Sequence, residues 1–256
     1  MVETYESKTK KIALLIDGDN AQPRLIQEIL AEAGKYGALT IRRIYGDWTT
    51  SNMQGWKDTL NSAAIQPIQQ FRFTVGKNAT DSAMIIDAMD ILHSRTVDGF
   101  CVVSSDSDYT RLATRIRESG VFVMGIGKRI TPKAFVNACN VFIFTENFDI
   151  KERTAPKGRK TTKQASSKEA KEAKEDKKIF DPLPLLKGAF DMAIQEDGWA
   201  NIATMGFYLR QLDPSFDPRT YGHRQLSQLL KSQTKLFDMR FQETPGSTDI
   251  FVRLKD

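Results

Sequence analysis

Between residues 12 and 145, short apolar runs alternate with segments in which apolar side chains recur at helical spacing. This alternation is typical of a strand, a crossover helix and a parallel strand, repeated along the chain. The apolar runs predict six strands, at residues 12–17, 39–45, 65–71, 100–105, 121–127 and 141–145. Runs this apolar indicate that helices cover both faces of the sheet.

The segments between the strands predict four helices, at residues 23–37, 81–94, 108–120 and 132–140. A glycine ends the first and third segments, and a proline opens the last, as is common at helix termini. The pattern therefore predicts a doubly wound α/β domain with a mostly parallel sheet over residues 11–150, after a polar tail at residues 1–10.

Residues 151–178 contain eleven Lys or Arg and five Asp or Glu, a net charge of +6, and no aromatic or large aliphatic side chain. Such a segment cannot bury enough apolar surface to offset its ordering entropy. We expect a charged flexible linker, disordered or transiently helical around residues 168–178. It serves either as a solvated tether or as an accessory RNA contact, because basic side chains release counterions from phosphates.

Residues 179–256 show three helical patterns followed by two alternating runs typical of a hairpin. This arrangement predicts a second, smaller domain, a winged-helix-like α+β unit. A length of 256 residues is consistent with two domains.

Composition adds two expectations about the environment of the protein. No segment approaches the roughly 20 uninterrupted apolar residues of a membrane span, so we expect a cytoplasmic protein that does not bind membranes. Cys101 and Cys139 each lie in an apolar run without the paired spacing of a zinc or disulfide framework. We expect two reduced, buried thiols.

Aspartates follow the predicted strands at the points where parallel strands end. Asp17 closes the first strand, Asp106 and Asp108 follow the fourth, and Asp81 begins the helix after a loop. In an open parallel sheet, ligands bind beyond the carboxyl ends of the strands, where the strand order reverses. We therefore expect these side chains to converge at one edge.

Grouped carboxylates resist simultaneous ionisation unless a cation compensates their charge. An all-oxygen set without His or Cys favours Mg²⁺ or Mn²⁺, which can bind a scissile phosphate and activate water. We predict Asp17, Asp81, Asp106 and Asp108 as metal ligands, with Asn20 orienting a phosphate or a water. The alternative for Asp81 and Asp108 is helix capping.

The roles of three neighbouring aspartates are less clearly indicated by the sequence. Asp19 belongs to the site or caps the next helix. Asp87 and Asp90 lie further along their helix, where we expect them to face solvent or a neighbouring basic residue.

Three motifs, IDGDN, TDSAMIIDAMD and VSSDSDYTRLATRIRESG, resemble the NYN domain family, a PIN-like nuclease group that includes bacterial LabA-like proteins. The resemblance covers roughly residues 10 to 147. It implies a PIN-like fold and cleavage of RNA with a divalent metal held by Asp17, Asp81, Asp106 and Asp108.

The segment from about residue 179 to residue 254 resembles the LOTUS, or OST-type winged-helix, domain, notably in PLPLLKGAFDMAIQEDGWANIATMGFYLRQLDPSFDPRTYG. That family is associated with RNA binding, and the alternative is a module that binds a protein partner. The side chains offered to phosphates and bases are Lys187, Arg219, Tyr221, His223, Arg224 and Lys231.

Four further residues carry weaker signals. Lys77 reaches a phosphate from the loop before Asp81 or stays solvated. Trp48 and Trp56 flank a polar loop, where packing is favoured over base stacking. His93 is expected to be structural.

The sequence therefore predicts a metal-dependent ribonuclease whose C-terminal domain selects or positions RNA. One alternative is a catalytically silent RNA-binding or scaffold protein. Another is a phosphatase, because Asp17, Gly18 and Asp19 are similar to a DxD motif with a nucleophilic first aspartate. Whether the chain forms a homodimer is left open.

Overall fold

The computed structural model describes residues 9–71, 79–148, 181–244 and 247–255. The chain divides into two compact units, Met1–Phe148 and Asp149–Asp256. The predicted linker, residues 1–8 of the N-terminal tail, and Lys77 lie outside the described residues.

The N-terminal unit contains a six-stranded parallel sheet in the order β3-β2-β1-β4-β5-β6. Its strands are β1 (Lys11–Asp17), β2 (Ala38–Gly46), β3 (Gln66–Gln69), β4 (Gly99–Val103), β5 (Phe122–Gly127) and β6 (Val141–Phe144). All six strands were predicted. The third is shorter than the run 65–71 and lies at the sheet edge, where Pro67 is tolerated because one side of the strand needs no partner.

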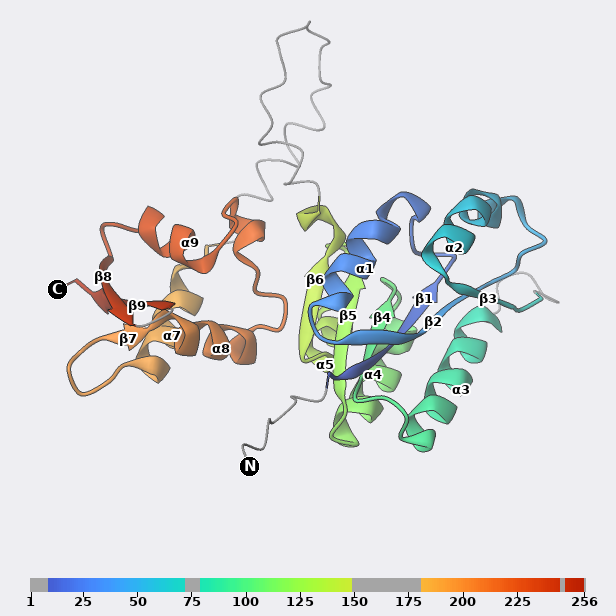
Figure 1. Ribbon diagram of the computed structural model, residues 1–256, viewed down its shortest axis with the longest axis horizontal. Coiled ribbons are helices and arrows are strands. Elements are labelled where there is room, and N and C mark those ends of the chain that lie inside the picture. The colour runs from blue at the N-terminus through green and yellow to red at the C-terminus, as the bar shows by residue number, and fades with distance from the viewer. Residues whose placement is uncertain (1–8, 72–78, 149–180, 245–246, 256) are drawn as a thin grey trace, which may run out of the picture. The chain divides into compact units, whose positions relative to one another are not determined.

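Side chains of β1 alternate between two cores. Ala13 and Leu15 pack into a cluster that includes Leu112 of α4 (Thr110–Glu118), whereas Leu14 packs into a cluster that includes Ile29 of α1 (Ile26–Gly34). Figure 1 shows α1 and α2 (Lys57–Ala63) on one side of the sheet and α3 (Ala79–Ser94) and α4 on the other. The predicted doubly wound architecture is confirmed.

The predicted helices are present with shifted ends. The first comprises η1 (Pro23–Leu25) and α1, which ends at Gly34 rather than at Gly37. Lys35 and Tyr36 follow it in short-range turns, and the Tyr36 ring stacks on Phe122, with centroids 5.3 Å apart. The others are α3, α4 preceded by η3 (Ser107–Tyr109), and α5 (Lys133–Ala138).

The segment predicted as a polar loop between Trp48 and Trp56 is instead partly helical, with η2 (Ser51–Trp56) leading into α2. Its buried residues are Met53, Trp56, Leu60 and Ala63. Their spacing is helical, but the few apolar residues stand among polar ones. Trp56 is fully buried and Trp48 packs against the same core, which agrees with the packing interpretation of both.

In the C-terminal unit, residues 181–244 and 247–255 form three α-helices and a small antiparallel sheet in the order β7-β9-β8. Its elements are α7 (Leu183–Ala193), β7 (Ala200–Asn201), α8 (Ile202–Leu212), η6 (Pro218–Tyr221), α9 (Leu226–Ser232), β8 (Phe237–Thr244) and β9 (Ser247–Leu254). Leu186, Leu209 and Val252 bring helices and sheet together in one core. The predicted winged-helix-like unit of three helices and a hairpin is confirmed.

Two smaller expectations concern thiols and membranes. Cys101 and Cys139 are both free and buried. No helix in the described segments has both the length and the apolar character to cross a membrane.

Candidate metal centre

Asp17 is the last residue of β1 and is buried at the carboxyl edge of the sheet. Its Oδ2 accepts hydrogen bonds from the Asn20 side-chain amide at 2.7 Å and from the Ser104 hydroxyl at 2.8 Å. Its Oδ1 accepts the backbone amide of Asp19 at 3.1 Å. Burial raises the pKa of Asp17, and the hydrogen bonds from Asn20 and Ser104 partly oppose that rise. The carboxylate is therefore held in one orientation.

The turn after Asp17 lies where the strand order reverses, because β1 pairs with β2 on one side and β4 on the other. The Gly18 amide donates to the Tyr45 carbonyl at 2.9 Å. A Cβ at Gly18 would lie 2.8 Å from that carbonyl oxygen and 2.6 Å from Met53 Cε. Only glycine allows this close approach, which sets the direction of the turn carrying Asn20.

Three carboxylates gather beside this turn. Asp81 lies in the first turn of α3, Asp106 caps η3, and Asp108 lies within η3. One oxygen from each can be chosen so that all three lie within 4.8 Å of one another. Asp81 and Asp106 are half-buried and Asp108 is exposed, so the group opens to solvent on one side.

The charges of this cluster act on one another. Burial raises the pKa of Asp81, and the charges of Asp106, Asp108 and Asp19 raise it further. The Tyr109 hydroxyl opposes this by donating to Asp81 Oδ1 at 2.7 Å. A positive charge placed nearby would relieve the remaining repulsion between these carboxylates.

The residues present fit a hard divalent cation. All three clustered side chains offer carboxylate oxygens, which are the ligands that Mg²⁺ and Mn²⁺ prefer. No described His or Cys belongs to the group. The charges of Asp106 and Asp108 raise the pKa of Asp81, and a bound cation would offset this repulsion.

Asp17 lies outside the group of three but within electrostatic range of it, since the charge of Asp81 contributes to raising the pKa of Asp17. Two of its hydrogen bonds meet at Oδ2, whereas Oδ1 accepts a single one. One lone pair of Oδ1 is therefore left for a further partner. The predicted partner of Asn20 was a phosphate or water, and its amide in this structure binds Asp17.

Helix capping was the alternative considered for Asp81 and Asp108, but a different aspartate caps η3. The capping side chain of η3 is Asp106, whose Oδ1 accepts the Asp108 amide at 3.0 Å. Asp81 is the third residue of α3 and lies past its start. Asp19 is exposed and does not cap η1, whose N-cap is Gln22 without a side-chain hydrogen bond.

Sequence reasoning missed Ser104 and Tyr109, which donate hydrogen bonds to Asp17 and Asp81. Ser104 is buried, and its oxygen also accepts the Asp106 amide at 3.0 Å. It therefore connects the end of β1 to the loop that carries Asp106. Its place directly after an apolar strand was the available signal, whereas nothing in the local pattern distinguishes Tyr109 from a core aromatic residue.

Asp87, Asp90 and His93 lie further along α3 than Asp81. Asp87 forms an ion pair with Arg43 at 2.5 Å, in agreement with the expected contact to a neighbouring basic residue. It also accepts a hydrogen bond from the Tyr45 hydroxyl. Asp90 is exposed on α3, as is His93 in the last turn of that helix.

In the C-terminal unit, the residues predicted to contact RNA fall into two groups. Lys187, Arg224 and Lys231 are exposed and His223 is half-buried. Arg219 instead forms an ion pair with buried Asp217 at 2.6 Å, and the Tyr221 ring packs against Phe216 with centroids 5.8 Å apart. Arg219 and Tyr221 thus have contacts within the unit that RNA binding would have to accommodate.

Comparison with known structures shows modest likeness. A crystal structure of a Vibrio parahaemolyticus protein of unknown function is 18% identical, covering 53% of this chain and 93% of that chain, with a TM-score of 0.45. A solution structure of an uncharacterized Nitrosomonas europaea protein is 28% identical, covering 40% of this chain and 88% of that chain, with a TM-score of 0.27. The curated proteins include no match.

Family models match both units. The OST-HTH/LOTUS domain matches residues 177–247, which agrees with the resemblance of the C-terminal segment. The NYN domain matches residues 11–146, the whole sheet with its helices and all four predicted acidic positions. The chain therefore belongs to the NYN domain family, and it carries an OST-HTH/LOTUS domain after the NYN domain.

Proposed function

We propose that the N-terminal unit hydrolyses RNA phosphodiester bonds with the help of Mg²⁺ or Mn²⁺, and that the C-terminal unit selects or positions the RNA. The observation that carries this proposal is the gathering of Asp81, Asp106 and Asp108 oxygens within 4.8 Å at the edge where strand order reverses. The NYN match supports a nuclease of PIN-like fold, and the LOTUS match supports RNA as the polymer.

Asp81, Asp106 and Asp108 would hold the cation, with Asp17 Oδ1 as a fourth ligand atom. When bound, the cation supplies charge stabilisation at the scissile phosphate and lowers the pKa of the attacking water. In hydrolysis, the water oxygen bonds to phosphorus, one ester bond breaks, and its oxygen leaves with a proton.

The protein's own contribution is orientation. Tyr109 fixes one oxygen of Asp81, and Ser104 and Asn20 fix one oxygen of Asp17. The Asp108 amide fixes one oxygen of Asp106. Asp81 and Asp106 each retain an oxygen that is not used by these donors, and Asp17 Oδ1 accepts only the Asp19 amide. The ligand set is thereby organised before a cation arrives.

The burial of Asp17 disfavours the phosphatase alternative. A nucleophilic aspartate must present an oxygen to the phosphorus of its substrate. Asp17 is 1% exposed and its carboxylate accepts three hydrogen bonds within the protein. This position suits a residue that supports or completes an acidic site better than one that attacks a phosphate.

Incubating the full chain with end-labelled single-stranded and structured RNA tests the proposal. We expect cleavage with Mg²⁺ or Mn²⁺, no cleavage with a chelator, and a loss of at least about a hundredfold in Asp106→Asn. Asp90→Asn, which removes an exposed carboxylate elsewhere on α3, is the matched control and should cleave like wild type.

Equal cleavage by wild type and Asp106→Asn would indicate a contaminating nuclease and overturn the proposal. Cleavage by neither protein, together with metal-independent RNA binding, would favour a catalytically silent RNA-binding protein. A thermal shift with Mn²⁺ gives a second measurement, because a ligand that binds only the folded state stabilises it by about 2.7 kcal/mol at a hundred times its Kd.

A further inference from the structure

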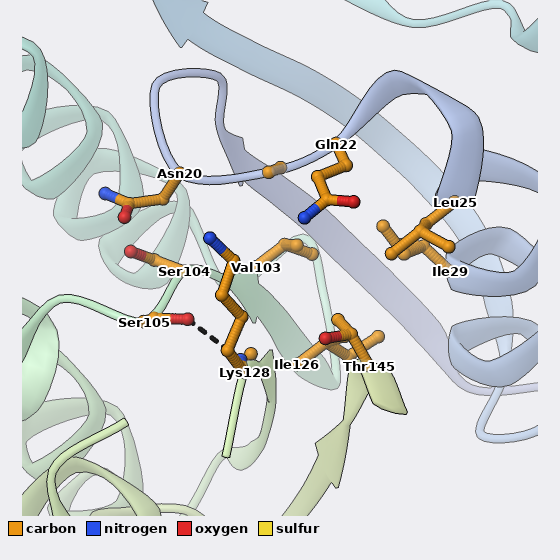
Figure 2. A pocket seen from close by; sticks show the side chains of 12 residues that line it. Asn20, Gln22, Leu25, Ile29, Val103, Ser104, Ser105, Ile126, Lys128 and Thr145 are labelled. Atoms are coloured by element: carbon orange, nitrogen blue, oxygen red, sulfur yellow. Dashed lines mark hydrogen bonds between the residues drawn. The ribbon is translucent and has the colours of Figure 1, made fainter. Parts of the chain in front are cut away.

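Two cavities flank the turn that follows β1. Figure 2 shows the smaller one, at the ends of β4 and β5, where the Lys128 amide donates to the Ser105 hydroxyl. Its volume of about 20 Å³ holds no more than one water molecule. The larger one has a volume of about 630 Å³ and lies on the other side of the turn, between α2 and β3. This volume is within the range of roughly 300–1,000 Å³ that is usual for small-molecule sites.

The larger cavity is formed by one face of a helical segment and one face of an edge strand. Its helical wall comes from η2 and α2 and consists of Met53, Gln54, Lys57, Leu60 and Asn61. Its strand wall comes from β3 and the residue before it and consists of Ile65, Pro67 and Gln69. These residues recur at helical spacing and at every second position, so each set shares one face. Trp48, which follows β2, completes the lining.

The lining is apolar inside and polar at the mouth. Met53, Leu60 and Ile65 are buried. The residues at the mouth are exposed and polar: Gln54, Lys57, Asn61 and Gln69. Such a site suits a flat ligand that has apolar faces and hydrogen-bonding groups at its edge.

Trp48 is held in one orientation at this cavity. Its indole Nε1 donates to the Ile68 carbonyl at 3.0 Å, and its backbone amide donates to Gln69 Oε1 at 3.0 Å. Gln69 is held in turn, because its Nε2 donates to Asp47 Oδ1 at 3.1 Å. The only polar atom of the indole is thereby used, so Trp48 offers the cavity an apolar aromatic surface. Trp48 is half-buried, unlike the fully buried Trp56, so packing against the core leaves part of it accessible.

The cavity adjoins the turn that belongs to the acidic site. Met53, which lines the cavity, packs on the backbone of Gly18, the residue directly after Asp17, since a Cβ at Gly18 would lie 2.6 Å from Met53 Cε. The strands beside the cavity end at the same edge as β1, with Asp17 opposite Tyr45 of β2 and Tyr45 opposite Ile68 of β3. The end of β3 is therefore two strand spacings, roughly 10 Å, from Asp17. Figure 1 shows α2 beside β3 at this side of the sheet.

We propose that this cavity binds a base of the RNA near the scissile bond, with Trp48 contacting the ring and Lys57 the phosphate of the same nucleotide. The proposal rests on the proposed function, which brings RNA to this edge of the sheet. A base has apolar faces, and its edge carries donors and acceptors that the amides of Gln54 and Asn61 can match. Within the described segments Lys57 takes part in no ion pair, so its charge is available to a phosphate.

RNA binding measured without turnover tests the cavity separately from catalysis. The full chain carrying Asp106→Asn serves as the reference, with Trp48→Leu, Lys57→Gln and Lys11→Gln each added to it. Lys11 is exposed at the opposite end of β1 and is the matched control for Lys57. The probes are a short single-stranded RNA and a series in which one base at a time is replaced by an abasic site. The linker and C-terminal unit are the same in all four proteins, so differences in affinity report the substituted side chain.

We expect Trp48→Leu to weaken binding of the intact RNA about five- to tenfold, the lower end for one base–aromatic contact. The slope of log affinity against log salt should not change, because a stacking contact releases no counterions. With the abasic site at the bound position, Trp48→Leu and the reference should bind equally, since the contact is already absent.

Lys57→Gln changes an exposed side chain and leaves the core intact. It should weaken binding about fivefold and lower the salt slope by about 0.7, as expected for one lost phosphate contact on a single strand. Lys11→Gln should change neither. If Trp48→Leu does not fold, the comparison of Lys57→Gln with Lys11→Gln decides the result alone.

A loss of affinity in Trp48→Leu that persists equally on every abasic RNA would assign Trp48 to folding alone and overturn the proposal. Equal affinity and slope in Lys57→Gln and Lys11→Gln would also overturn it, and would leave the cavity to another occupant, such as an extended peptide paired along the edge of β3. Failure of the wild-type protein to cleave RNA would overturn the ribonuclease but leave this binding result standing. Unchanged binding would remove the base site but leave cleavage intact.

Discussion

The Tyr109 hydroxyl donates a hydrogen bond of 2.7 Å to Asp81 Oδ1, joining η3 to the first turn of α3. Tyr109 is fully buried and its ring lies against Phe135, with centroids 6.4 Å apart. The direction of this bond is therefore set by the core rather than by solvent. The same short segment thus supplies a carboxylate at Asp108 and the donor that orients Asp81.

Tyr109→Phe keeps the ring and removes this donor. Without the hydrogen bond, the pKa of Asp81 should rise further, because the donor favours the ionised form. We expect the free energy of unfolding to fall by about 1 kcal/mol and Mn²⁺ affinity to fall several-fold. Urea denaturation and calorimetric titration with Mn²⁺ measure the two effects. Unchanged Mn²⁺ affinity would show that the hydroxyl serves folding alone.

The contribution of Asp81 to the stability of the metal-free protein should be lost as pH rises. Burial first, and then neighbouring carboxylates, raise the pKa of Asp81 in the folded state above its ordinary value of 3.8. The folded state therefore holds the proton more tightly than the unfolded chain does. Its relative stability is greatest below the ordinary value and is lost as pH rises through the raised value.

Asp81→Asn removes this titration while keeping an oxygen that can accept from Tyr109. Urea denaturation in a chelator, from roughly pH 4 to pH 8, should show a smaller loss of stability for this variant than for wild type. With saturating Mg²⁺, wild type should instead be the more stable of the two proteins, since it keeps the full set of proposed ligands and gains more from the cation. Parallel curves for the two proteins in the chelator would contradict the assigned origin of the pKa rise.

The sheet could be predicted because β1, β4, β5 and β6 are short apolar runs bounded by polar or turn residues, and β2 and β3 still place apolar side chains between them. β1 and β4 show this most clearly, since nearly all of their residues are buried. The segment 51–63 was missed because its buried face consists of isolated residues such as Met53 and Trp56 in polar surroundings. The helical spacing of these residues is a weak signal by itself, because the core they pack against comes from distant parts of the sequence.

Parallel-sheet topology predicted that Asp81, Asp106 and Asp108 would gather at one edge, and their oxygens do lie together. Their role as metal ligands stays a prediction. The contacts that support the site could not be predicted. Ser104 and Tyr109 act through hydroxyl directions that depend on tertiary packing.

Asp87 offers a contrast with Asp81 on the same helix. It pairs with Arg43 and the Tyr45 hydroxyl, and its side chain is 24% exposed. Asp87→Asn removes a partly buried charge from Arg43 and should lower the free energy of unfolding by about 1–3 kcal/mol. RNA cleavage per folded molecule should not change. Loss of cleavage without loss of stability would place Asp87 in the catalytic site instead.

The two thiols should be inert while the protein is folded. Burial raises the pKa of Cys139 to about 12, with Arg117 opposing, and burial also raises that of Cys101. The thiolate is the reactive form, so a raised pKa and lack of access both slow alkylation. At about pH 8, iodoacetamide should label neither thiol in the native chain and both after denaturation, as read by intact mass. Because the Cys139 thiol also donates to the Phe135 carbonyl at 3.4 Å, rapid native labelling at that residue would require local opening of α5.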